Sequence, residues 1–117
     1  MARKAIEDEL DSLVQQWSNG KRCQMCGAMA TETHHIGRKK TPLERYDLQN
    51  LMPVCHRCHT EIHNGHLNAY DKIPLKQRVY IETMKNMSYK NFLIFELGMT
   101  EDEFLRDCKR RFKELVK

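Results

Sequence analysis

The stretch VCHRCHTEIH, residues 54–63, places two cysteines and three histidines within ten positions. All five side chains are candidate metal ligands, whereas a tetrahedral zinc site takes four. If the stretch is a helix, His59 and His63 lie four residues apart and share one face, whereas Cys58, next to His59, points about 100° away. We therefore expect the cysteines and the histidines to serve two different metal sites.

The cysteines of this stretch have a second pair upstream. Two Cys-x-x-Cys units are present, Cys23/Cys26 and Cys55/Cys58, and the fifth cysteine, Cys108, lies far away in a helical pattern. In a reducing compartment such units bind metal more often than they form disulfides. We therefore predict a four-cysteine structural zinc site, with free core thiols as the alternative. Cys108 is expected to be a small buried residue.

The chain between the two thiol pairs contains the adjacent histidines His34 and His35. Neighbouring side chains of a strand point to opposite faces. We therefore expect one of them to join His59 and His63 on a second metal, which frees the other as a general base. Asn50 is a candidate for fixing the loop backbone and orienting that base through hydrogen bonds.

Length and composition predict one soluble domain. The chain has 117 residues, of which 40% are hydrophobic and 31% charged, and its net charge of +4 permits a polyanionic partner without requiring one. We expect an N-terminal helix (residues 1–20), a zinc-stabilised core (21–66) and a helical C-terminal extension (67–117). The absence of a long apolar run or a signal-peptide core predicts an intracellular protein without membrane contact.

Hydrophobic periodicity predicts a mostly helical α+β protein. Helices are expected over residues 3–17, 56–64, 74–86, 88–97 and from 101 onward, short strands over 28–36 and 51–55, and a loop over 37–49. Pro53 limits the second strand to an edge position. Thr100 and Glu103 form a capping-box pattern before the last helix. His56 and His66 are expected to be exposed.

The histidines at 34 and 35, Asn50, and His59 within NLMPVCHRCH resemble the His-Asn-His signature of HNH nucleases. The flanking Cys-x-x-Cys pairs resemble those of HNH members that hold their ββα-metal (His-Me) finger together with zinc. The resemblance covers residues 22–66. The basic loop after the histidines and the helical tail also resemble phage recombination nucleases of the NinG type, which implies the cytoplasm of a bacterium or of a phage-infected cell.

The resemblance implies a role for each matching residue. His34 stands where the family places its first metal ligand, often Asp, and His35 where it places the general base. Asn50 matches the orienting residue, His59 the last histidine of the signature, and His63 a further ligand. The structural zinc would be held by Cys23, Cys26, Cys55 and Cys58. The catalytic ion would be Mg, Mn, Ni, Co or Zn, and three imidazoles without a carboxylate disfavour Mg.

The function implied by the resemblance is metal-dependent DNA endonuclease activity. His35 would take a proton from water, which attacks phosphorus in line and yields 5′-phosphate and 3′-hydroxyl ends. Arg38, Lys39 and Lys40 would contact the DNA backbone without reading sequence, with a solvated charge run as the alternative. The alternative function is a non-catalytic, zinc-stabilised DNA-binding module. No oligomeric state is indicated by the sequence.

Overall fold

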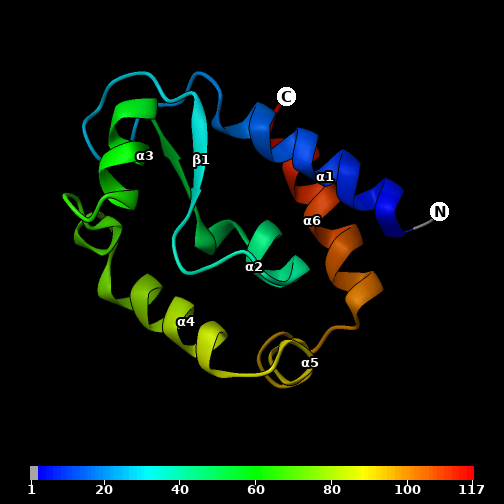
Figure 1. Ribbon diagram of the computed structural model, residues 1–117. Coiled ribbons are helices and arrows are strands. Elements are labelled where there is room, and N and C mark those ends of the chain that lie inside the picture. Colours follow the sequence, from blue (N-terminus) through cyan, green and yellow to red (C-terminus); the bar gives the residue numbers. More distant parts are fainter. Residues whose placement is uncertain (1–2) are drawn as a thin grey trace.

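A computed structural model describes residues 3–117 (Figure 1). Its elements, in order, are α1 (Arg3–Ser18), β1 (Glu32–His35), α2 (Pro42–Tyr46), η1 (Leu48–Asn50), β2 (Leu51–Val54), α3 (His56–His63), η2 (Ala69–Lys72), α4 (Leu75–Asn86), α5 (Tyr89–Asn91), the π-helical η3 (Phe92–Leu97) and α6 (Glu101–Leu115). The predicted α+β, mostly helical architecture is confirmed. Figure 1 shows β1, β2 and α3 at one end of the molecule and α1 beside α6 at the other.

The two strands and the helix that follows them form a ββα finger. β1 and β2 are antiparallel, with Glu32 opposite Val54 and His35 opposite Leu51. In the described residues each is an edge strand, which is the position that tolerates a proline such as Pro53. α3 begins directly after β2, and the Cys55 sulfur at its N-cap accepts a hydrogen bond from the backbone N of Cys58. The second thiol pair therefore lies at the start of α3.

Two hydrophobic clusters hold the finger against the helices. The larger lies between α1, α2, α4, η3 and α6, and its fully buried side chains include Leu10, Tyr46, Phe92 and Phe112. Trp17 of α1 packs edge-on against Phe112 of α6, with ring centroids 6.1 Å apart. The smaller cluster lies under the finger and contains Cys23, Ile36, Met52, Val54, Cys58, Ala69 and Ile81. α4 belongs to both clusters and thus joins the extension to the finger.

The segment 37–49, predicted to be a loop, contains a helix instead. Thr41 and Glu44 form a complete capping box at the start of α2, with Pro42 in the first turn. These are strong local helix-start signals. They outweigh the polar composition and the glycine of this segment, on which the loop prediction rests, and that prediction is wrong for residues 42–46. The first strand is also shorter than predicted, since residues 28–31 lie outside β1 apart from an isolated bridge at Met29.

The predicted helices of the extension are confirmed with small shifts in their ends. Thr100 and Glu103 form the expected capping box at the start of α6. Cys108 is buried in the larger cluster, at 2% exposure, as predicted for a small core residue. Among the described residues, no helix has the length and apolar character needed to cross a membrane.

Candidate metal centres and catalytic site

The four finger cysteines converge on one point. The sulfurs of Cys23, Cys26, Cys55 and Cys58 all lie within 4.8 Å of one another. The sulfurs of Cys26 and Cys55 are 3.7 Å apart, close to the separation of about 3.8 Å that a tetrahedron with Zn–S bonds of about 2.3 Å requires. Gly27, with a φ of +84°, closes the turn that carries the first pair. The geometry therefore fits one zinc ion.

The protonation of the cysteines fits a cation at their centre. Burial, followed by contacts with the other three sulfurs, raises the pKa of the Cys58 thiol to about 12. Burial also acts to raise the pKa of Cys23, but backbone N–H donors, including that of Cys55, outweigh it and lower that pKa to about 6. A thiolate at Cys23 therefore disfavours ionisation of the Cys58 thiol. A divalent cation removes this conflict, because a metal-bound thiol is deprotonated outright.

Three histidines form a second convergent set, on the other side of α3. His34 on β1 faces His59 and His63 of α3, with ring centroids 5.2 and 5.6 Å away. The Nε2 atoms of His59 and His63 are 3.1 Å apart, near the roughly 3.3 Å expected for two nitrogens bound to one metal at about 2.0 Å. It is thus His34, and not His35, that the strand turns toward the α3 histidines.

Burial favours the neutral form of His34. Desolvation, followed by the charges of His59 and His63, lowers the pKa of His34 to about 4. A neutral imidazole has a free lone pair at neutral pH, which a metal ligand requires. The set therefore fits a divalent ion in both geometry and protonation.

His35 lies beside this set, at the edge of the same cleft. The cleft has a volume of about 440 Å³ and is lined by Thr33, His34, His35, Ile36, Gly37, Arg38, Lys39, His59, Ile62 and His63. Desolvation, with the nearby charge of Lys39, lowers the pKa of His35. The ring is therefore neutral near pH 7, which is the form that a general base needs.

Asn50 is fully buried, and its side-chain hydrogen bonds go to backbone groups. Its Oδ1 accepts from the backbone N of Gly37 at 2.7 Å, and its Nδ2 donates to the carbonyls of Arg38 and Glu44 at 2.9 and 2.8 Å. These bonds tie the segment that leaves β1 to the residue that precedes β2. Asn50 thus fixes the loop directly after His35.

The three basic residues of this loop differ in their surroundings. The Arg38 guanidinium contacts the carboxylate of Glu44 through Nε and donates to the carbonyl of Lys85 at 3.2 Å. Glu44 is buried and also accepts from the backbone N–H groups of Lys40 and Thr41. All three residues are exposed, but Arg38 is held in place by these contacts. Arg38 and Lys39 line the cleft.

Sequence reasoning missed Glu32. Its Oε1 lies 2.7 Å from Nδ1 of His59, and its Oε2 lies 2.7 Å from Nδ1 of His56. The hydrogen bond from His59, above all, holds the pKa of the Glu32 carboxyl below its usual range, against the opposing effect of burial. Period-two spacing offered a signal, because Glu32 and His34 share one face of β1. His56 and His66 are exposed, as expected.

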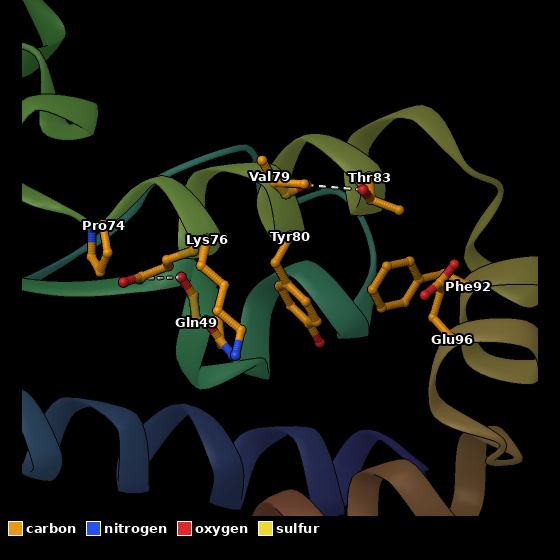
Figure 2. A pocket seen from close by; sticks show the side chains of 9 residues that line it. Gln49, Pro74, Lys76, Val79, Tyr80, Thr83, Phe92 and Glu96 are labelled. Carbon is orange, nitrogen blue, oxygen red and sulfur yellow. Dashed lines mark hydrogen bonds between the residues drawn. The ribbon is translucent and has the colours of Figure 1, made fainter.

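A second hollow lies away from both metal sets, between η1, α4 and η3 (Figure 2). Its volume is about 510 Å³. The Tyr80 and Phe92 rings meet edge to face at 5.5 Å along its floor, and Gln77 donates to the carbonyl of Gln49 beside it. Its lining contains no histidine or cysteine, so that it offers none of the metal ligands of the finger.

The ββα finger with its four-thiol and three-imidazole sets has the architecture of a ββα-metal domain, and its four thiols could hold a structural zinc ion. The HNH endonuclease family model matches residues 23–65, which span this finger, and the segment belongs to that family. The resemblance of the sequence to HNH nucleases is thus confirmed.

Among curated proteins, the mitochondrial DNA mismatch repair protein mutS homolog of Sarcophyton glaucum is similar to part of the chain. The two are 31% identical over an alignment of 65 residues, and the matched part covers 50% of this chain and 7% of that protein. No solved structure matches the chain significantly.

Proposed function

We propose that this protein is a metal-dependent DNA endonuclease that hydrolyses phosphodiester bonds. The observation that carries the proposal is the convergence of three imidazoles in the cleft that also contains His35 and two basic side chains. The family match over residues 23–65 supports a nuclease or DNA-binding role. The similarity to a protein named for DNA mismatch repair supports DNA as the nucleic acid.

The chain supplies ligands for two kinds of ion. Cys23, Cys26, Cys55 and Cys58 would hold a structural zinc, and a second divalent ion would be held by His34, His59 and His63. When bound, this second ion supplies Lewis-acid stabilisation of the charge that builds on the phosphate and the leaving oxygen. An all-imidazole set favours Zn, Ni, Co or Mn over Mg.

The remaining residues of the cleft act on water and on the DNA backbone. His35, neutral at pH 7, would take a proton from the water that attacks phosphorus, leaving 5′-phosphate and 3′-hydroxyl products. Asn50 would keep the loop after His35 in place through its backbone hydrogen bonds. Lys39 and Lys40 would contact phosphates, beside an Arg38 that Glu44 already orients.

Plasmid nicking with Mn²⁺ or Mg²⁺ tests this proposal. We expect the wild type to nick supercoiled DNA, and His35→Ala to keep the fold and both metals while losing activity about 100-fold or more. His66→Ala is the matched control, because His66 is an exposed histidine outside the cleft. Full cleavage by His35→Ala would refute the base assignment. If the wild type binds DNA but does not cleave it with any divalent ion, the protein is instead a non-catalytic binding module.

A further inference from the structure

The carboxylate of Glu32 bridges two histidines of α3. One oxygen lies 2.7 Å from Nδ1 of His59 and the other 2.7 Å from Nδ1 of His56. Glu32 opens β1, whereas the two histidines lie three residues apart in the first turns of α3. The bridge therefore connects the strand that carries His34 to the helix that carries His59.

The bridge has a consequence for the two ring nitrogens of His59. A neutral imidazole has one N–H, and the hydrogen bond made by one nitrogen sets which nitrogen carries it. An ionised Glu32 only accepts hydrogen bonds, so that Nδ1 of His59 must carry the proton and Nε2 the lone pair. Nε2 is also the atom that approaches Nε2 of His63 at 3.1 Å. The lone pair thus points to the place where the three imidazoles converge.

We propose that Glu32 is a positioning residue for the catalytic metal: it fixes the His59 tautomer and ring orientation so that Nε2 is presented to the ion. This inference rests on the proposed function, since it takes the three-histidine set as the site of a divalent ion. Carboxylates that hold a metal-binding histidine in this way also raise its basicity, and their loss typically weakens metal binding about 10–100-fold.

His56 completes the arrangement from outside the ligand set. Its side chain is largely exposed, and its hydrogen bond occupies the second oxygen of Glu32. With both oxygens engaged, the carboxylate has little freedom to rotate away from His59. The role of His56 is therefore secondary, and its removal should matter less than that of Glu32.

A carboxylate–histidine pair at the C-terminal end of the same helix serves as a matched control, with Glu61 in α3 and His66 just beyond it. Glu61 lies 2.7 Å from Nδ1 of His66, the same distance as in the Glu32 pairs, but neither residue belongs to the three-histidine set. Glu61→Ala removes one negative charge and one histidine contact from α3. It thereby separates a general charge effect from the positioning of His59.

Calorimetric titration of the zinc-loaded protein with Co²⁺ tests the inference. We expect Glu32→Ala to bind Co²⁺ at least about 10-fold more weakly than the wild type, and Glu61→Ala to bind it unchanged. Zinc content by elemental analysis should stay the same in all three. Glu32→Ala binding Co²⁺ as tightly as the wild type would overturn the role of Glu32 and leave the proposed function intact. A wild type that binds no ion beyond its zinc would overturn both.

Nitrogen-15 NMR of the histidine rings provides a readout independent of catalysis. In the zinc-loaded wild type without the second ion, we expect His59 to carry its proton on Nδ1. Glu32→Gln, whose amide oxygen still accepts from Nδ1, should keep this tautomer, whereas Glu32→Ala should give a mixture of the two. A wild-type His59 protonated on Nε2 would overturn the inference even if a variant failed to fold.

Discussion

The side chain of Asn50 accepts a hydrogen bond from the backbone N–H of Gly37 at 2.7 Å, joining the end of β1 to the start of β2 across the finger. Gly37 follows the two histidines of β1 by two residues, and Asn50 directly precedes β2. Asn50 is fully buried, and its amide also donates to the carbonyls of Arg38 in the loop and of Glu44 in α2. Asn50 therefore helps to fix the position of the loop after His35, together with Glu44, which holds Arg38 and the backbone N–H groups of Lys40 and Thr41.

Replacing Asn50 with Ala should destabilise the protein by about 2–4 kcal/mol, because the backbone groups of Gly37, Arg38 and Glu44 lose their partner and each unpaired buried group costs about 1–3 kcal/mol. Urea unfolding of the zinc-loaded protein measures the loss. Asn68→Ala is the control, since Asn68 is exposed and accepts from the backbone N of Tyr70. It should cost about 1 kcal/mol. Equal losses for the two variants would contradict the assigned role of Asn50.

Gly37→Ala should destabilise the loop through crowding. A Cβ at Gly37 would lie 3.0 Å from Cγ2 of Ile81 and 3.1 Å from Oδ1 of Asn50, although the backbone there lies outside the left-handed region. We expect a loss of about 1–3 kcal/mol, the usual range for overpacking a well-packed site. In a double-mutant cycle, the substitution should cost less in the Asn50→Ala background, because part of the clash is then absent. Additive losses would show that the clash with Asn50 is unimportant.

Loss of one zinc ligand should unfold the finger, whereas loss of the fifth cysteine should not. Cys26 is exposed, so that Cys26→Ser removes little packing, and any large effect reports on the metal. We expect this variant to lose its zinc and much of its cooperative thermal transition. Cys108→Ala should keep one zinc per chain and cost about 1–2 kcal/mol as a small core truncation. A zinc-loaded, fully folded Cys26→Ser protein would contradict the four-cysteine site.

The finger was predictable because its signals are local. The ligand spacings in 54–63 and the thiol pair at 23 and 26 fix which residues share a face, and the structure brings each set within 4.8 Å. Strand geometry places His34 and His35 on opposite faces of β1, but it does not say which of the two faces α3 covers. The residue spacing alone therefore left open which histidine meets α3. The structure resolves this in favour of His34.

Contacts between distant segments were not predictable in the same way. Glu32 and His56 are 24 residues apart, and their hydrogen bond exists only once the β1–β2 register places the start of β1 beside α3. Arg38 reads as a free basic residue in the sequence, yet it contacts the buried Glu44. The helix α2 that carries Glu44 had a local signal in Thr41, Pro42 and Glu44, and a capping-box search would have found it.

The burial of His34 predicts a stability that falls in mild acid. Burial and the neighbouring charges lower its pKa to about 4 in the folded state, against about 6.5 when unfolded. Between these values the unfolded chain binds the extra proton and the folded chain does not, so that the free energy of unfolding decreases as the pH falls from 6.5 toward 4. This proton therefore costs no stability above about pH 6.5, and most of the loss in the free energy of unfolding is complete near pH 4.

Urea unfolding at pH 7.5 and 5.5, with zinc bound and the second ion removed, measures this contribution. The titration of His34 should lower the free energy of unfolding by about 1 kcal/mol between pH 7.5 and pH 5.5. His34→Phe keeps a buried aromatic ring but has no proton to bind, while the other titrating groups of the chain are unchanged. Its unfolding free energy should therefore fall less between the two pH values, by about that amount. Parallel pH dependences of the wild type and His34→Phe would show that His34 is not buried as a neutral ring.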